Sequence, residues 1–155
     1  MPFSAGKGTT GMLERDPAGS EGGHVARILI VDDDPAIRTL LDELLREEGY
    51  STVLACDGQS AIEQARATQP HLILMDLMLP VLDGATAIRV LKSDPRTNQI
   101  RIIAMSAGHN LRLQADDLPA DGVLSKPFDL DALLAHVAVY TRHVANHEQS
   151  EVAGA

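Results

Sequence analysis

The chain has a single cysteine, Cys56, among its 155 residues. One cysteine cannot form a disulfide within the chain, and the paired-cysteine spacings of zinc sites are absent. Because disulfides persist mainly in oxidising compartments, their absence favours a reducing, intracellular setting. Cys56 follows a short apolar run. We expect it to be the last residue of a strand, with its side chain packed in the interior.

Long apolar runs and an excess of positive charge are also missing. No stretch approaches the roughly 20 apolar residues that a membrane-spanning helix needs, and residues 1–23 lack the apolar segment of a secretory signal. Lysine and arginine number 13 against 22 acidic residues, which gives a formal net charge of −9. This charge repels the phosphates of nucleic acids and anionic membranes, so we expect the protein to bind neither. A protein partner with a basic surface is favoured instead. The missing membrane-spanning and signal segments favour a cytoplasmic protein.

Composition divides the chain into three parts. Half of the 12 glycines lie within residues 1–25, and such a polar segment cannot bury enough apolar surface to offset its ordering entropy. We expect a flexible arm over residues 1–25, one domain over residues 26–141 and a polar tail over residues 142–155. Gly6–Thr9 looks like the end of a phosphate-binding loop, but the earlier glycine and the preceding strand are missing, so we attribute it to chance.

Residues 26–141 alternate between short apolar runs and amphipathic segments. Strands are predicted at residues 27–31, 51–55, 71–75, 101–105 and 122–125. Helices are predicted at residues 37–45, 60–67, 85–91, 111–118 and 130–140. Because the strands are apolar throughout, helices should cover both faces of the sheet. The expected fold class is α/β, a three-layer sandwich around a five-stranded parallel sheet of order 2-1-3-4-5, which is the flavodoxin-like arrangement.

Four of the predicted strands end next to a residue that can bind a metal ion or a phosphoryl group. These residues are Asp32 and Asp33, Asp76, Ser106, and Lys126. The carboxyl ends of parallel strands meet at one edge of a sheet, where open α/β sheets bind ligands. Acids, a hydroxyl and a lysine together suit a divalent cation, a carboxylate nucleophile and a clamp for a transferred phosphoryl group. The sequence therefore predicts a protein that accepts phosphate on an aspartate.

The acidic residues at this edge have different explanations. Asp34 stands directly before a proline, which is the pattern of a helix N-cap, and we assign it to capping. Asp32 and Asp33 would repel each other unless a cation lies between them. Asp76 lies in a strongly apolar stretch, where an unpaired carboxylate is costly. Magnesium held by Asp33 and Asp76 would offset this cost, and Lys126 would neutralise charge on the phosphoryl group.

Four motifs, in this order, resemble those of the CheY-like receiver domain of two-component response regulators. They are Ile28-Leu-Ile-Val-Asp-Asp-Asp-Pro35, Leu74-Met-Asp-Leu-Met-Leu-Pro80 with Asp83-Gly84, Met105-Ser-Ala107, and Leu124-Ser-Lys-Pro-Phe128. The resemblance covers about residues 26–141. It implies that Asp76 accepts a phosphoryl group from a phosphohistidine on a sensor histidine kinase or a histidine phosphotransfer protein. It also implies that Asp32, Asp33 and Asp76 bind Mg²⁺ together with the backbone carbonyl of Met78.

The resemblance assigns further roles near the end of the domain. Ser106 would be the switch hydroxyl, Lys126 would contact the phosphate, and both would assist the transfer that the domain itself catalyses. The family has a cis peptide bond at the position of Lys126 and Pro127. It usually has Tyr or Phe where this chain has Val123. We therefore expect a weakened link between phosphorylation and the surface formed by the fourth helix and fifth strand.

No output domain is expected, because the chain ends about a dozen residues after the last predicted helix. The expectation is a stand-alone receiver, a signalling phosphoacceptor that acts through altered protein–protein contacts, with pairing of two copies left open.

Two alternatives remain open at this point. A haloacid-dehalogenase-type phosphatase would use Asp32 as the nucleophile and Asp34 as the acid, but it has Thr or Val where this chain has Ala36. A degenerate receiver would only bind partners and would never be phosphorylated. The complete acid set argues against this second alternative, whereas Val123 favours it.

Overall fold

The computed structural model describes residues 25–107 and 118–154, in which helices and strands alternate along the chain. The elements are β2 (Arg27–Val31), α1 (Pro35–Glu47), β3 (Ser51–Ala55), α2 (Gly58–Thr68), β4 (Leu72–Asp76), α3 (Gly84–Ser93), β5 (Arg101–Ala107), β6 (Gly122–Lys126) and α5 (Leu130–Gly154). Residues 1–24 of the expected arm, and residues 111–117 of the expected fourth helix, lie outside the described part.

The strands form one parallel sheet in the order β3-β2-β4-β5-β6, which is 2-1-3-4-5 along the chain. This confirms the predicted topology. The chain first adds β3 on one side of β2 and then builds outward on the other side from β4. Ligands of open α/β sheets bind at such a reversal, beyond the carboxyl ends of the strands. Val31 is paired with Met75 across β2 and β4, so Asp32 and Asp76 come next to each other at this edge.

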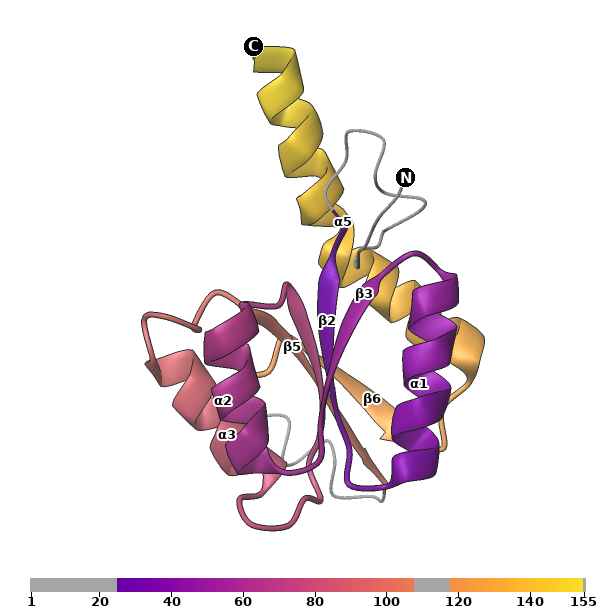
Figure 1. The fold of residues 1–155 in the computed structure, drawn as a ribbon, viewed down its shortest axis with the longest axis vertical. Coiled ribbons are helices and arrows are strands. Elements are labelled where there is room, and N and C mark those ends of the chain that lie inside the picture. The colour runs from indigo at the N-terminus through magenta and orange to yellow at the C-terminus, as the bar shows by residue number, and fades with distance from the viewer. Residues whose placement is uncertain (1–24, 108–117, 155) are drawn as a thin grey trace, which may run out of the picture.

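Helices cover both faces of the sheet, as predicted (Figure 1). One face packs against α2 and α3, and its core includes Leu29 and Val31 from β2. The other face packs against α1 and α5, and its core includes Ile28 and Ile30 from the same strand. Each such fully buried aliphatic side chain stabilises the fold by roughly 2 kcal/mol. Successive side chains of β2 thus pack into the cores on opposite faces of the sheet, so the strand that leads to Asp32 is anchored on both sides.

The edge strands differ from the expectation that every strand is buried on both faces. β2 and β4 are buried along almost their whole length, whereas the residues of β3 and β6 are mostly half-buried or exposed. Leu54 in β3 is 42% exposed. An edge strand has a sheet neighbour on one side only, so an apolar sequence does not by itself ensure burial there.

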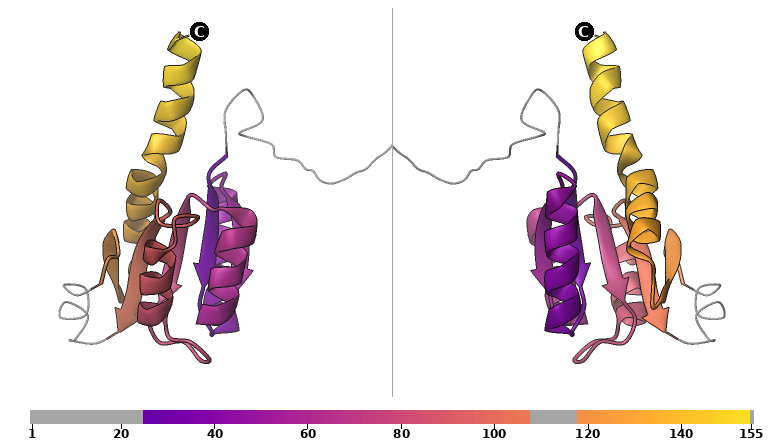
Figure 2. Two further views of the ribbon diagram at one scale, coloured as in Figure 1. Left: turned by 90° about the vertical axis from the view of Figure 1, so that its left-hand side faces the viewer. Right: turned by 90° about the vertical axis from the view of Figure 1, so that its right-hand side faces the viewer.

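One further expectation, the packing of Cys56 in the interior, is wrong, and α5 is longer than the predicted helix. Cys56 is exposed rather than packed in the interior, because β3 ends at Ala55 and Cys56 lies in the turn before α2. The chain also stays helical past Thr141, and α5 continues to Gly154, extending beyond the sheet (Figure 2). No proline or glycine occurs between Thr141 and Gly154, so the sequence contains no residue that ends the helix earlier.

None of the helices in the described part of the chain has the length and apolar character of a membrane-spanning segment.

Candidate functional site

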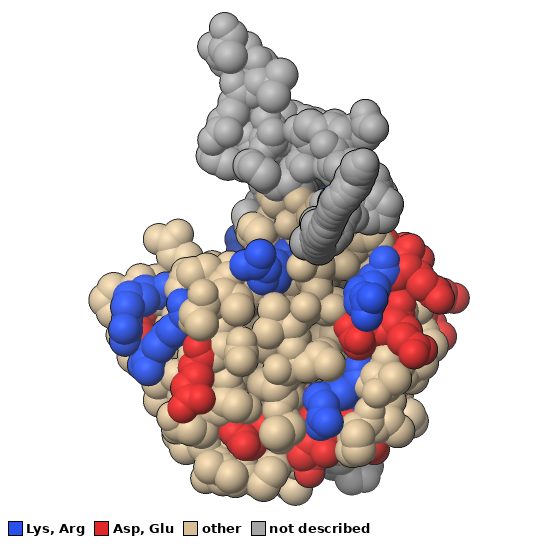
Figure 3. All heavy atoms as spheres, viewed as in Figure 1, with Lys and Arg blue, Asp and Glu red and all other residues tan. Residues whose placement is uncertain are grey.

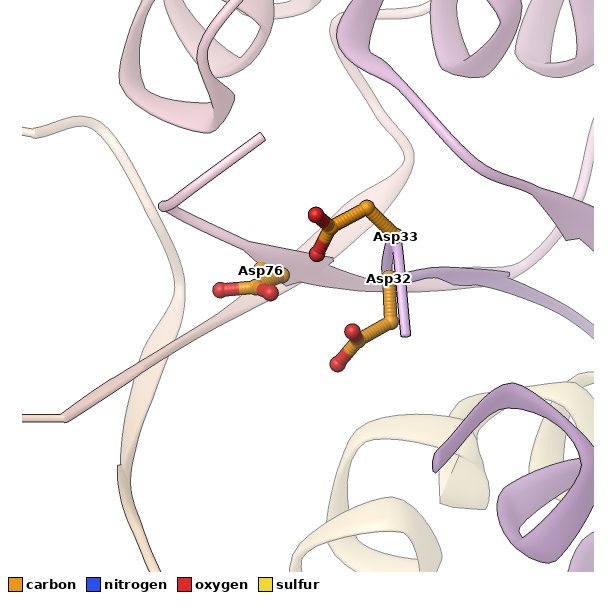
Figure 4. A group of neighbouring side chains, drawn as sticks. All are labelled: Asp32, Asp33 and Asp76. Atoms are coloured by element: carbon orange, nitrogen blue, oxygen red, sulfur yellow. The ribbon is translucent and has the colours of Figure 1, made fainter. Parts of the chain in front are cut away.

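Three carboxylates meet at the carboxyl edge of the sheet. Asp76 is the last residue of β4, and Asp32 and Asp33 directly follow β2. One oxygen from each of the three side chains lies within 4.8 Å of the others. Figure 4 shows the three side chains projecting from the ends of these two strands into a shared space. The sheet order alone brings Asp76 to residues more than 40 positions earlier in the chain.

Asp32 is almost completely buried, and its carboxylate is held from two sides. Its side chain Oδ1 accepts a hydrogen bond from the backbone N–H of Asp34 at 2.9 Å. Its Oδ2 accepts one from Lys126 Nζ, also at 2.9 Å. The backbone N–H of Asp32 donates to the carbonyl of Ala55 at 3.2 Å, which ties this residue to the neighbouring strand. Asp32 is therefore fixed before any ligand binds.

Asp76 is 4% exposed. Its Oδ1 accepts a hydrogen bond from the backbone N–H of Met78 at 3.1 Å, and its Oδ2 lies 3.3 Å from Lys126 Nζ. Burial raises the pKa of Asp76 above its ordinary value, and the nearby charge of Asp32 raises it further. The hydrogen bond from Met78 and the charge of Lys126 oppose this rise but do not cancel it.

Lys126 connects the two buried carboxylates from the end of β6. Burial by itself lowers the pKa of Lys126, but the hydrogen bond to Asp32 and the charges of Asp76 and Asp32 outweigh burial, so the pKa is raised. The lysine thus stays charged. Two buried acids share this single lysine, which leaves the group with an excess negative charge that attracts a cation.

Asp33 is the exposed member of the group. Within the described residues its carboxylate accepts no hydrogen bond, so its oxygens are available to a ligand. Mg²⁺ takes oxygen ligands, needs only one or two carboxylates and keeps several waters. Asp33 and Asp76, with Asp32 beside them, fit that requirement.

Ser106 lies in β5, one residue after the residue that is paired with Asp76 in β4. Met105 is paired with Asp76 across the two strands, and Ser106 follows inside β5 rather than after it. Ser106 is 5% exposed, and its hydroxyl donates to the carbonyl of Ala107 at 3.1 Å. The hydroxyl is therefore directed at its own strand in this structure.

Val123 lies in β6, three residues before Lys126, and packs against the core on the α2 and α3 face. The peptide bond between Lys126 and Pro127 is cis. The position at which the resemblance implies an aromatic ring is thus filled by a smaller aliphatic side chain.

Asp34 does not belong to the carboxylate group. Its side chain accepts a hydrogen bond from the backbone N–H of Ala36 at 2.9 Å and caps α1, as predicted. A haloacid-dehalogenase-type site would need Asp34 beside the reacting centre as a proton donor. The capping bond at the start of α1 therefore argues against that alternative.

The sequence reasoning missed two residues at the site, Arg38 and Gly84. Arg38 Nη1 donates to the backbone carbonyl of Asp32 at 2.7 Å. A Cβ atom on Gly84 would lie 2.1 Å from the carbonyl oxygen of Asp76, so the start of α3 approaches the backbone of this acid too closely for any side chain. Gly84 stood in one of the motifs, but its role depends on a contact between elements that sequence spacing does not reveal.

The family model of the response regulator receiver domain matches residues 28–138. The chain belongs to the response regulator receiver domain family. This confirms the resemblance drawn from the four motifs and accounts for the sheet order and for the acids at its carboxyl edge.

Related proteins extend this result. The sequence is 42% identical over 118 residues to the DNA-binding dual master transcriptional regulator RpaA of Synechocystis sp., covering 75% of this chain but 49% of RpaA. The receiver thus spans about half the length of that relative. The receiver domain of the sensor histidine kinase PA1611 from Pseudomonas aeruginosa, a structure with magnesium coordinated in its active site cleft, gives a TM-score of 0.69 and 31% identity, covering 77% of this chain and 97% of that one.

A second solved structure is a complex. The co-crystal structure of the Saccharomyces cerevisiae histidine phosphotransfer protein Ypd1 with the receiver domain of its downstream response regulator Ssk1 gives a TM-score of 0.72 and 28% identity, covering 78% of this chain and 92% of that one.

Proposed function

We propose that this receiver accepts a phosphoryl group on Asp76 from a phosphohistidine, in a reaction that depends on Mg²⁺ bound by Asp32, Asp33, Asp76 and the backbone carbonyl of Met78. The single observation that carries the proposal is the group of three carboxylates within 4.8 Å, two of which share Lys126. Such a group suits phosphoryl transfer, in which positioning and charge neutralisation account for most of the catalysis.

The side chains of this receiver have distinct tasks in the transfer. An oxygen of the Asp76 carboxylate attacks phosphorus and forms an acyl phosphate, while the bond between phosphorus and the donor imidazole nitrogen breaks and the imidazole leaves. Lys126 Nζ already lies 3.3 Å from Asp76 Oδ2 and neutralises charge on the moving group. Mg²⁺ held by the three carboxylates and the backbone carbonyl of Met78 would supply further charge neutralisation. The hydroxyl of Ser106 rotates from Ala107 to donate to a phosphoryl oxygen.

The phosphoryl donor is expected to be a sensor histidine kinase or a histidine phosphotransfer protein. The complex of Ypd1 with the Ssk1 receiver supports the second kind of donor. Figure 3 shows acidic side chains gathered over α1, where Glu43, Glu47 and Glu48 are exposed. Complementary charge raises the rate at which partners meet, so a donor with basic residues at its contact surface is favoured.

Phosphorylation then signals through altered protein contacts. It adds roughly 1.5 to 2 negative charges at neutral pH, and it recruits Ser106 toward the phosphoryl group. The name of RpaA records DNA binding for that protein. For this chain, the net charge of −9 favours a protein partner over nucleic acid, and we propose that the receiver acts on a protein.

The proposal is tested with a small phosphodonor such as acetyl phosphate. With Mg²⁺ present, intact-protein mass spectrometry should show one added phosphoryl group. When a chelator is present during the reaction, the protein should gain no mass. D76N should abolish the gain, whereas D34N should retain it, because Asp34 caps a helix outside the carboxylate group. A wild-type protein that gains no mass favours the degenerate receiver, and sustained hydrolysis of an added phosphomonoester favours the phosphatase.

A further inference from the structure

Arg38 reaches back from α1 to the acidic turn that precedes the helix. Its guanidinium Nη1 donates to the backbone carbonyl of Asp32 at 2.7 Å, and the side chain is half-buried. A bond from the fourth residue of a helix to the carbonyl two residues before the N-cap is not part of helical hydrogen bonding, because it spans six residues and uses a side chain. It fixes the one peptide unit that joins Asp32 to Asp33.

Asp33 lacks the anchors that the other two carboxylates have. Asp32 is held by Lys126 and by the N–H of Asp34. Asp76 is held by Lys126 and by the N–H of Met78. The carboxylate of Asp33 accepts no hydrogen bond within the described residues, so its position depends on the backbone that carries it. That backbone is the peptide unit whose carbonyl Arg38 binds.

We propose that Arg38 is a positioning residue that orients Asp33 toward Asp76 for the binding of Mg²⁺, an inference that rests on the proposed function. Some groups do not bind the metal but orient a residue that does. Removing such a group commonly weakens metal affinity by about 10- to 100-fold. Arg38 acts through the backbone and does not need to touch the metal. The planar guanidinium suits this task because its donors are held in a fixed arrangement.

Charge and geometry make opposite predictions for the loss of Arg38. Arg38 places a positive charge close to the acids, so charge alone predicts that an uncharged replacement binds Mg²⁺ more tightly. Loss of positioning predicts weaker binding, because Asp33 then samples orientations that cannot reach the shared site. The sign of the change therefore separates the two effects.

The test compares R38M with R46M in the full chain. Arg46 lies on the same helix, is 64% exposed and pairs with Asp42 rather than with the acidic turn. Both variants lose one positive charge from α1 by the same substitution. Mg²⁺ dissociation constants are measured by titration calorimetry at constant ionic strength. We expect about tenfold weaker binding for R38M and a wild-type value for R46M.

Amide NMR spectra of the metal-free proteins supply a second readout. The ¹⁵N resonance of Asp33 reports on its own peptide unit and should shift in R38M, while the amides of β4 should keep their positions and show that the variant is folded. If R38M does not fold, R38Q, which also removes the charge, takes its place in both measurements, with R46Q as its control.

The outcomes distinguish this inference from the proposed function. Weaker Mg²⁺ binding with a shifted Asp33 amide supports the role of Arg38. Unchanged or tighter binding by R38M, with wild-type protein and R46M both binding Mg²⁺, overturns that role and leaves the proposed function intact. If the wild-type protein does not bind Mg²⁺, both fall together.

Discussion

At the level of single side chains, the site is defined by an imbalance of charge. Asp32 and Asp76 are both buried, and Lys126 is the lysine that they share. A buried ion pair is tolerated when its charges match, but an extra buried carboxylate is costly unless a cation compensates it. The sequence showed this cost for Asp76, because the acid lies among apolar residues. It could not show that Lys126 lies nearer to Asp32 than to Asp76.

The raised pKa of Asp76 predicts how D76N changes stability. The ordinary value is 3.8, and the folded-state pKa lies above it because of burial and the charge of Asp32. The native state therefore binds this proton more tightly than the unfolded state, so stability falls as pH rises through this interval. D76N removes the buried charge that causes this loss of stability. Asp32 and Lys126 then form a pair with one negative and one positive charge. We expect metal-free D76N to melt at a higher temperature than the wild-type protein at neutral pH.

The raised pKa of Asp76 also determines how the stability difference between D76N and the wild-type protein depends on pH. As pH falls toward the ordinary value of 3.8, Asp76 becomes protonated before the unfolded chain does, and the advantage of D76N should shrink. Thermal melts over this range, without metal, measure it. A variant that is less stable than the wild-type protein at neutral pH would show that Asp76 stabilises the fold, contrary to this account.

Among the helices and strands, caps and close contacts set the geometry of the carboxyl edge. Asp34, Asp57 and Asp83 each accept a backbone hydrogen bond at the N-terminus of the helix that follows. Acids therefore collect at this edge for two reasons, capping and the carboxylate group. Sequence patterns separated these reasons for Asp34, because a proline follows it. They also placed every described element except the end of α5 to within a few residues.

The remaining errors follow from contacts between elements. Cys56 was expected in the interior because an apolar run precedes it, yet that run is an edge strand that ends one residue earlier. Arg38 carried no signal, because a bond from a side chain to a backbone carbonyl six residues earlier belongs to no sequence pattern. Local periodicity reports which residues form an element, but not how closely two elements approach.

The close approach of α3 to β4 predicts a large effect for G84A. A Cβ at this position would lie 2.1 Å from the carbonyl oxygen of Asp76, and backbone atoms cannot move aside cheaply. We expect the free energy of unfolding to fall by about 3 kcal/mol and phosphorylation of Asp76 to slow.

G49A is the matched control for this substitution. Gly49 has a φ of 96° and nothing within 4 Å of the added Cβ, so only backbone strain of about 1 kcal/mol applies. Urea unfolding of both variants measures the difference. Equal losses for G84A and G49A would mean that the contact with Asp76 is unimportant.

Across the complete domain, the sheet order brings the site residues together from four strands. The sequence predicted this order because buried parallel strands with helical crossovers have few allowed arrangements. It did not predict the length of α5, since a polar helix that continues beyond the core lacks the apolar periodicity that marks a helix.

Metal binding should stabilise the folded domain as a unit. A ligand that binds only the native state stabilises it by about 2.7 kcal/mol at a hundredfold excess over the dissociation constant. We expect Mg²⁺ to raise the melting temperature of the wild-type protein, with NaCl at equal ionic strength as the control. D33N should fold normally, because Asp33 is exposed, but should show a much smaller shift. An equal shift in D33N would remove Asp33 from the metal site.

The proposed function requires Asp76 to be the residue that carries the phosphoryl group. Borohydride reduces an aspartyl phosphate to homoserine, so treatment of the phosphorylated protein followed by peptide mass spectrometry locates the modified residue. We predict homoserine at position 76 and at no other aspartate. Homoserine at position 32, as a haloacid-dehalogenase-type site would give, or its absence from every position, would contradict the account.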